Sequence, residues 1–561
     1  MPGADSLPNH LSMIDVAARK ISLTHARTRD LPLRWFWIAV GGTAGALAAV
    51  LGAYLMTWPP HEDETLALFV GRGSLPHVLD TVIAQRGGAP LHFVFAWAVA
   101  HLGGGLTELR LVSLIFAVAS VPAIALLGAR LADRLVGVVA AALASATWVL
   151  LFQGVYGRMY SLFLFTSALS FIAMLDALEL PGRRRFVLWG IALLATLASH
   201  PYAVLVFGTQ ALFVVLRGER RRAGLTTLGV VAALAAPFWW ADVVLRDRFG
   251  VGVGGGGAQL GSPQAVAHYF WWVSGDFAAG HREWSTPVLL VAAAGFVLLA
   301  LRRRRSALLT ACVVAVPAFA FMVAKLHATA SPEARHLIFA LPFFSTLLAT
   351  TLVEAARARP PVTAVVALVA LVALVVGEVQ WAHRKTPQLF DGDPPNEAHA
   401  RTEAAAWLAS TARPNDVLLG YEPLYLVAWE HNRSFSHYAL PRADPKLLAS
   451  ALRAVQEPLG RGVWVFDASD TTNVWERQSI RFALPAPARA FEGRVFGPYL
   501  VLRSRAPLGS REHYLTVSEE VMRLGRQLEI GDADVNLHTM LLAAKRLYDS
   551  PASSSRSTIS R

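Results

Sequence analysis

Three carboxylates and an imidazole follow one another in the stretch His61-Glu62-Asp63-Glu64, just after an apolar run that ends at Trp58. A carboxylate within hydrogen-bond reach of a hydroxyl can act as a general base. Ionised carboxylates are costly in hydrocarbon, so these acids must lie at a membrane surface or in a wet cavity. Successive helical residues point in different directions, so only one or two of the acids can face a given substrate. An alternative is a capped first turn of a helix over residues 64–69, where acids favour the positive helix end.

Arg158 and Tyr160 begin another apolar run and form a second set of groups with usable chemistry. A guanidinium group presents a fixed fork of donors that suits a phosphate or a carboxylate, and tyrosine adds a hydroxyl on a flat apolar ring. The alternative is interfacial anchoring, in which the arginine side chain snorkels and the tyrosine belongs to an aromatic belt. The residues alone leave both interpretations open.

The elements that position these groups are membrane helices. Of the 561 residues, 54% are hydrophobic and only 16% are charged, and the mean hydropathy is +0.44, unlike an ordinary soluble domain. Apolar runs of spanning or near-spanning length occur at 34–58, 109–128, 135–152, 159–178, 186–199, 202–217, 225–245, 287–301, 306–326, 336–356 and 362–380. A further run at 90–102 is shorter. The sequence therefore predicts an α-helical polytopic membrane protein.

Basic residues between the runs set the predicted orientation. If the run at 90–102 lies in the membrane interface, five basic loops fall on the same side of the membrane as the basic N-terminal arm, residues 1–33. If the run is counted as a span, all five loops move to the opposite side. These loops are Arg130–Arg134, Arg183–Arg185, Arg217–Arg222, Arg302–Arg305 and Arg357–Arg359. Because positive loops stay in the cytoplasm, we predict about eleven spans, an outer C-terminus and interfacial helices in the first outer loop. The net charge of +12 then faces anionic lipid of a bacterial cytoplasmic membrane, and no nucleic acid is expected.

Two histidine-containing stretches fall on the same predicted outer face as the acids. His200-Pro201-Tyr202 interrupts an apolar run too long for one span, which predicts a tight turn; whether the two side chains also line a cavity stays open. Lys325, His327, Arg335 and His336 lie in or beside one short outer loop. Basic residues on the outer face oppose the charge bias, so a bound anion such as a lipid phosphate explains them better than orientation.

The composition changes after about residue 380, where mixed polar segments replace apolar runs. Helices are predicted at 396–412, 516–528 and 535–548, and strands at 416–420, 462–466 and 494–502, the last as one strand or a pair. The predicted domains are therefore a basic arm (1–33), a transmembrane domain (34–380), a small extracytoplasmic α/β domain (381–549) and a disordered tail (550–561).

From residue 34 to about 380, the order of these motifs resembles the GT-C superfamily of membrane glycosyltransferases, in the branch of the protein O-mannosyltransferases and the lipid A aminoarabinose transferase. The matching positions are Asp63-Glu64, Gly88–Phe93 (close to a P-P-L-[YF]-[YF] stretch), Gly103–Arg110, Leu126–Leu131, Arg158–Tyr160 and Ala334–His336. The chain departs from the pattern at Ala89-Pro90, at His336 in place of a tyrosine, and at His61-Glu62 before the acidic pair.

The resemblance implies a role for each of these groups. Asp63 would be the base that deprotonates the acceptor hydroxyl, and Glu64 would support it. Donor phosphate binding is assigned to Arg158, Tyr160, Lys325 and Arg335. The substrate cavity would be lined by His61, Glu62, His200, Tyr202, His327 and His336. A divalent cation at His61–Glu64 is conceivable, and no other cofactor is expected.

The predicted function is inverting transfer of a hexosyl or pentosyl group from a polyprenyl-phosphate donor to a hydroxyl of a glycan, lipid or protein acceptor on the outer face. Such a transfer needs a base on one side of the anomeric carbon and stabilisation of a departing anion on the other. Two rivals stay open: a secondary transporter, which would place its acids near the midplane, and a non-catalytic membrane partner in cell-envelope glycan or lipid export.

Overall fold

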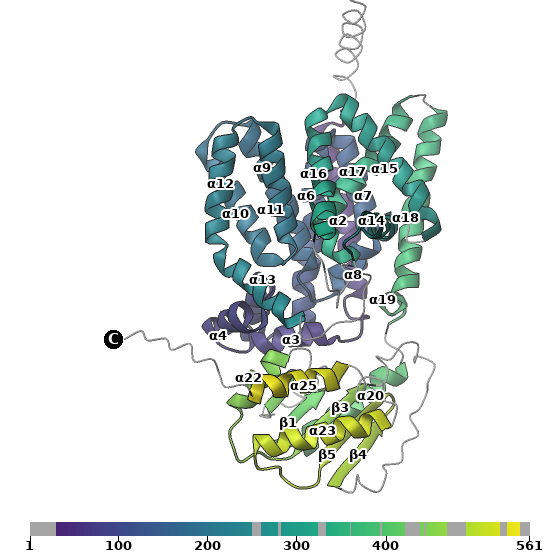
Figure 1. Cartoon of the computed structure of the whole chain (residues 1–561). Helices are drawn as coiled ribbons and strands as arrows, with labels where there is room; N and C mark the ends of the chain where they lie inside the picture. Colours follow the sequence, from purple (N-terminus) through teal and green to yellow (C-terminus); the bar gives the residue numbers. More distant parts are fainter. Residues whose placement is uncertain are drawn as a thin grey trace, which may run out of the picture.

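The computed structural model shows a bundle of helices with a small α/β domain at one end (Figure 1). It describes residues 30–249, 260–278, 282–323, 333–358, 361–392, 395–420, 424, 438–441, 445–467, 490–527 and 536–549. The predicted basic arm, except for its last residues, and the predicted disordered tail lie outside these ranges. We call the end of the bundle that carries the α/β domain the sheet-side end, and the opposite end the far end.

Seven helices are long and apolar enough to cross a membrane, or nine if each of two bent pairs is one span, among the described residues. The single helices are α2 (Leu33–Tyr54), α6 (Leu106–Leu131), α9 (Tyr160–Glu179), α15 (Arg282–Arg302), α16 (Arg304–Val323), η2 with α17 (Ala334–Ala340, Leu341–Ala358) and α18 (Val362–Lys385). The bent pairs are α7 (Arg134–Ala146) with α8 (Trp148–Val155), and α12 (Arg221–Leu234) with α13 (Ala236–Phe249). Two further bundle helices are α10 (Arg183–Ser199) and α11 (Ala203–Arg217). The chain is a multi-pass membrane protein.

Burial separates the central helices of the bundle from the peripheral ones. In α9, 72% of the most apolar window is buried inside the protein, whereas the corresponding value for α18 is 11%. The exposed side chains of α18 include Val365, Val369 and Val376. An apolar helix exposed along its length needs hydrocarbon around it, so α18 faces lipid and α9 belongs to the core.

The first connection on the sheet-side end consists of short helices that precede the second long helix. They are α3 (Glu62–Gly71), α4 (Leu75–Asp80), the π-helical turn η1 (Thr81–Arg86) and α5 (Pro90–His101). The short apolar run at 90–102 is α5, which is not among the candidate spans. Gly87, with φ +79°, fits where η1 meets α13 because a Cβ there would lie 2.4 Å from the Ala241 carbonyl oxygen.

A break between α7 and α8 places the second set of predicted site residues. The two helices differ in direction by 63°, and Thr147 lies between them. Its hydroxyl accepts a hydrogen bond from the Leu150 backbone N–H at 3.3 Å and so caps α8. The chain leaves α8 after Val155 and turns through Tyr156–Met159 into α9.

The α/β domain contains a five-stranded mixed sheet in the order β2-β1-β3-β5-β4. The strands are β1 (Val417–Gly420), β2 (Tyr438–Pro441), β3 (Gly462–Asp467), β4 (Phe491–Phe496) and β5 (Tyr499–Ser504). Strand β1 runs parallel to β2 and β3, whereas β5 is antiparallel to β3 and β4. The helices are α20 (Pro395–Thr411), α22 (Pro445–Ala454), α23 (Arg511–Gln527) and α25 (Asn536–Asp549), with a short α19 (Pro387–Asp391) before them.

Most predicted elements of this domain are confirmed. The three helices and the strands appear, and the run at 494–502 is a pair, the β4–β5 hairpin. Strand β2 and helix α22 were not predicted. Four residues are too few for an alternating pattern to stand out, and β2 is formed only by pairing with β1.

The α/β domain packs on the same short helices that carry the acidic stretch. Phe69 of α3 contacts the apolar cluster formed by α20 and the sheet, and Leu447 of α22 joins the cluster of α3, α4 and α5. Helix α3 is therefore held between the bundle and the α/β domain.

Candidate functional site

Asp63 lies in the first turn of α3, with about a third of its side chain exposed. One carboxylate oxygen forms an ion pair with Arg158 Nη1 at 2.6 Å, and the other accepts a hydrogen bond from the Tyr156 hydroxyl at 3.4 Å. Burial alone would raise the pKa of this carboxyl. The charges of Arg158 and His61 and the hydrogen bond from Arg158 outweigh that effect and lower the pKa well below its usual range. Asp63 is therefore an ionised carboxylate beside a guanidinium group.

Glu64, the next residue, faces the protein interior and is fully buried. Arg110 of α6 binds both of its carboxylate oxygens, at 2.8 and 2.7 Å, and the Gly157 backbone N–H donates to it at 2.7 Å. It also accepts the His61 backbone N–H at 3.2 Å, which completes a capping box at the start of α3. These contacts join α3, α6 and the turn before α9. They suit a residue that positions Asp63 better than one that contacts a substrate.

Arg158 reaches Asp63 from a turn with a fixed backbone. Its carbonyl oxygen accepts a hydrogen bond from the Ser113 hydroxyl at 3.2 Å. Its side chain is 13% exposed, and its buried Nε has no hydrogen-bond acceptor among the described residues. The guanidinium group therefore has donor capacity beyond the pair with Asp63.

An aromatic and histidine cluster continues from this pair. The Tyr160 hydroxyl lies 3.5 Å from His336 Nε2, and the His336 ring stacks on Tyr202 at a centroid distance of 4.7 Å. His200 is 5.1 Å from the Tyr160 ring and is stacked on Phe163. Burial and the charges of Arg158 and Arg335 lower the pKa of His200 to about 3, so it is neutral at physiological pH. Predicted site residues from three separate segments thus meet: Tyr160, His200 with Tyr202, and His336.

Arg335, in η2, lies over the Tyr160 ring at 5.4 Å and forms an ion pair with Glu333 at 2.8 Å. Its buried Nε has no acceptor among the described residues. Its charge is close enough to contribute to the low pKa of Asp63. The structure therefore brings Asp63, Arg158 and Arg335 into one electrostatically coupled group.

The remaining predicted residues have different placements. His61 caps α3, and its Nδ1 lies 2.9 Å from the Tyr156 hydroxyl. Glu62 is half-buried at the first position of α3. No group of three or more His, Cys, Asp or Glu side chains in the described part of the chain converges to hold a metal ion, and Glu64 is committed to Arg110. Lys325 and His327 lie outside the described residues.

Three further residues contribute to the site without having been predicted. Tyr156 contacts both His61 and Asp63, and Arg110 neutralises Glu64. His92 of α5 is buried, its Nε2 has no partner among the described residues, and burial with the charges of Arg158 and Arg86 lowers its pKa to about 3. A charge at the start of an apolar run was a usable signal for Arg110. His92 lies in the stretch Gly88–Phe93 that carries the resemblance, although it was given no role, whereas no pattern in the sequence distinguishes Tyr156.

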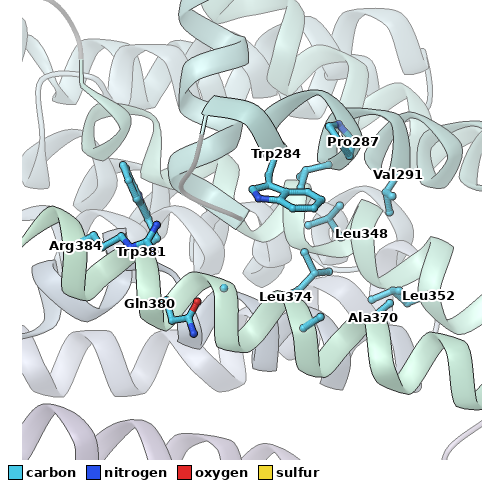
Figure 2. A pocket seen from close by; sticks show the side chains of 13 residues that line it. Trp284, Pro287, Val291, Leu348, Leu352, Ala370, Leu374, Gln380, Trp381 and Arg384 are labelled. Carbon is cyan, nitrogen blue, oxygen red and sulfur yellow. The ribbon is translucent and has the colours of Figure 1, made fainter.

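An apolar cavity of about 390 Å³ lies elsewhere, between α15, α17 and α18 (Figure 2). Trp284, Leu348 and Leu374 are among the side chains that line it, and Gln380, Trp381 and Arg384 lie toward one end. The Trp381 ring N–H donates to the buried Asp276, which forms an ion pair with the partly exposed Lys385 at 2.6 Å. This cavity is separate from the short helices of the first connection.

No family model and no curated protein matches the sequence. The crystal structure of ArnT from Cupriavidus metallidurans in the apo state is similar, with a TM-score of 0.54 and 12% identity over 83% of this chain and 97% of that one. The structure of the same protein bound to undecaprenyl phosphate gives the same TM-score and identity, over 84% of this chain and 98% of that one. The apo oligosaccharyltransferase of Archaeoglobus fulgidus is 12% identical over 79% of this chain and 71% of that one, with a TM-score of 0.50. The resemblance inferred from the motif order is thus confirmed at the level of architecture: the chain has the fold of the GT-C membrane glycosyltransferases.

Proposed function

We propose that this protein is an inverting glycosyltransferase that moves a sugar from a polyprenyl-phosphate donor to an acceptor hydroxyl. The observation that carries the proposal is the 2.6 Å ion pair between Asp63 and Arg158 at the sheet-side end of a membrane bundle, with a second guanidinium group, Arg335, over the ring of Tyr160. A base and a cationic site for a leaving phosphate are the two parts that this reaction requires. The undecaprenyl phosphate bound to ArnT, which shares the fold, supports this class of donor.

The proposed membrane arrangement has eleven spans, the nine candidates together with α10 and α11. The N-terminus is cytoplasmic, and the sheet-side end is the outer face of a bacterial cytoplasmic membrane. Residues 34–380 form the catalytic domain, and residues 381–549 form the extracytoplasmic domain. The two domains meet where Phe69 of α3 packs against the extracytoplasmic domain and Leu447 of α22 packs against the short helices. A domain in that position can present an acceptor next to Asp63.

In the proposed reaction, a carboxylate oxygen of Asp63 takes the proton of the acceptor hydroxyl. The acceptor oxygen attacks the anomeric carbon as the bond from that carbon to the phosphate oxygen breaks, which inverts the configuration. The electron pair of that bond stays on the phosphate, where Arg335 and Arg158 stabilise the charge. The ring cluster of Tyr160, His200 and the partly exposed Tyr202 would hold the sugar in position for attack.

The test uses full-length protein purified in detergent and a radiolabelled polyprenyl-phosphate sugar. Release or transfer of the label by wild-type protein, and its loss in Asp63→Asn with an unchanged unfolding midpoint, would support the proposal. Arg130→Met, at the far end, serves as the matched charge-removal control and should retain turnover. Binding of the donor without turnover, for any acceptor supplied, would favour a non-catalytic membrane partner.

A further inference from the structure

The contact between Asp63 and Arg158 poses a problem for the proposed reaction. Arg158 Nη1 occupies one Asp63 oxygen at 2.6 Å, and the Tyr156 hydroxyl lies 3.4 Å from the other. An acceptor hydroxyl needs one of these oxygens within hydrogen-bond reach. In addition, the guanidinium charge stabilises the ionised form of Asp63, which makes this carboxylate a weak base while the pair is intact.

Arg158 is built so that its side chain, and not its backbone, can change partner. The turn is held by the hydrogen bond from Ser113 to the Arg158 carbonyl and by the bond from the Gly157 N–H to Glu64. The buried Nε has no acceptor among the described residues. A phosphate offers several acceptor oxygens, and a guanidinium group binds it through two parallel hydrogen bonds.

Asp63 would keep its orientation if Arg158 left. The Tyr156 hydroxyl lies 3.4 Å from the second carboxylate oxygen, and the Asp63 backbone N–H donates to His61 Nδ1 at 3.2 Å. The same hydroxyl lies 2.9 Å from His61 Nδ1, and His61 is fixed as the cap of α3. The carboxylate would therefore stay in place with one oxygen free for an acceptor.

We propose that Arg158 exchanges partners during the reaction: it binds Asp63 while the donor site is empty and moves to the donor phosphate when the donor binds. The base is then available only after the donor has bound, so an acceptor hydroxyl is not deprotonated in its absence. This inference rests on the proposed function and adds a fixed order of events to it.

The test measures binding of a polyprenyl phosphate without sugar to full-length protein in nanodiscs. If Asp63 competes with the phosphate for Arg158, Asp63→Asn should bind this lipid more tightly, by roughly 10-fold. Loss of a nearby negative charge could tighten binding by itself, so the same change is made in the Arg158→Gln background. The exchange predicts that the gain disappears there, whereas a through-space charge effect would persist.

Glu333→Gln is the matched control, because it also removes an acid that pairs with a cation of the site, Arg335, at 2.8 Å. Its effect on lipid affinity should be the same with and without Arg158→Gln. If Arg158→Gln does not fold, Arg158→Lys takes its place, since lysine keeps the charge but lacks the two-pronged donor fork. The Asp63→Asn gain should again be reduced.

The outcomes separate the inference from the function on which it rests. Wild-type protein that does not bind the polyprenyl phosphate contradicts the proposed function. Binding that is unchanged or weaker in Asp63→Asn contradicts the exchange alone, because Arg158 would then contact Asp63 and the phosphate at the same time. A gain of full wild-type size in Arg158→Gln, or in Arg158→Lys where that variant replaces it, also overturns the exchange.

Discussion

The two ends of the bundle use the same residue types in different ways. At the far end, Arg130 binds Asp176 at 2.6 Å with both side chains a quarter or more exposed, although Arg217 at the same end is only 3% exposed. At the sheet-side end, Arg158 and Arg335 are more buried than Arg130, and the Nε of each has no acceptor among the described residues. Water screens and solvates the first kind of pair, whereas the second keeps a strong field and unused donors. For Arg130, Arg158 and Arg335, burial and not charge therefore decides how strongly the guanidinium group can act on a nearby anion.

The largest expected effect comes from removing the base at the sheet-side end. Asp63→Asn keeps the size of the side chain but cannot take a proton, so transfer should fall by about 10²- to 10⁴-fold. The measurement is single-turnover transfer from a polyprenyl-phosphate sugar, with a thermal unfolding scan as the check on folding. Turnover retained near the wild-type rate would show that another group is the base.

Breaking the buried pair next to Asp63 should affect folding more than chemistry. Arg110→Met leaves the Glu64 carboxylate buried with only backbone donors, at a cost of roughly 3–5 kcal/mol. The unfolding midpoint and the yield of purified protein should both drop. The double variant Glu64→Gln with Arg110→Met should recover part of the loss, and an unaltered midpoint in the single variant would contradict the structural role.

Arg335→Ala should weaken donor binding more than acceptor binding. A hydrogen bond to a charged group contributes about 1.5–3 kcal/mol, so the donor KM should rise roughly 10- to 100-fold. Arg335→Lys should restore part of this affinity but not the bidentate contact. An unchanged donor KM in the alanine variant would remove Arg335 from the phosphate site.

The Asp63–Arg158 pair should also contribute to stability in a pH-dependent way. The pKa of Asp63 is lower in the folded protein than in the unfolded chain, so the contribution is present above about pH 4 and is lost as the pH falls through the folded value. Because the side chain is partly exposed, we expect only ~1 kcal/mol. The difference in unfolding midpoint between wild type and Asp63→Asn should stay nearly constant from pH 7 to about pH 5 and shrink below about pH 4; a difference that widens below pH 4 would reverse the sign.

The smallest effect is expected at the far end. Arg130→Met removes one partner of an exposed pair, which typically contributes about 0–1 kcal/mol. Transfer and donor affinity should be unchanged, and the midpoint should move little. A loss of activity comparable to that of Arg335→Ala would mean that the two ends are coupled, and the contrast between them would fail.

Much of the architecture could be predicted because each membrane helix requires a long apolar run in the sequence. Long apolar runs marked every candidate span, and alternating or periodic patterns marked most of the α/β domain. The patterns could not show that the run at 135–152 is two helices bent at Thr147, since a bend depends on what packs around it. Strand β2 was missed for a related reason, because its partner β1 defines it.

The site was predicted less completely than the fold. Asp63, Arg158 and Arg335 stood out because charges beside apolar runs are expensive and therefore informative. The sequence analysis treated Asp63 and the adjacent Glu64 as one acidic pair, in which Glu64 supports the base. The structure separates them: Asp63 faces Arg158 and Tyr156, whereas Glu64 is buried against Arg110. Tyr156 carried no distinguishing signal, because an isolated tyrosine in an apolar context is common, and His92 lay in the matching stretch Gly88–Phe93 without being assigned a role.

The sequence by itself determined that this is a multi-pass membrane chain with a C-terminal α/β domain and acids where a helix leaves the membrane. These properties follow from the transfer cost of each local segment, which is fixed by composition. Only the tertiary structure decided which of two adjacent carboxylates meets a guanidinium group beside the ring cluster and which is neutralised inside the protein. That choice depends on the rotation of α3 about its own axis. The rotation is set by packing of α3 against α6, the turn before α9 and the α/β domain, which are far apart in the chain.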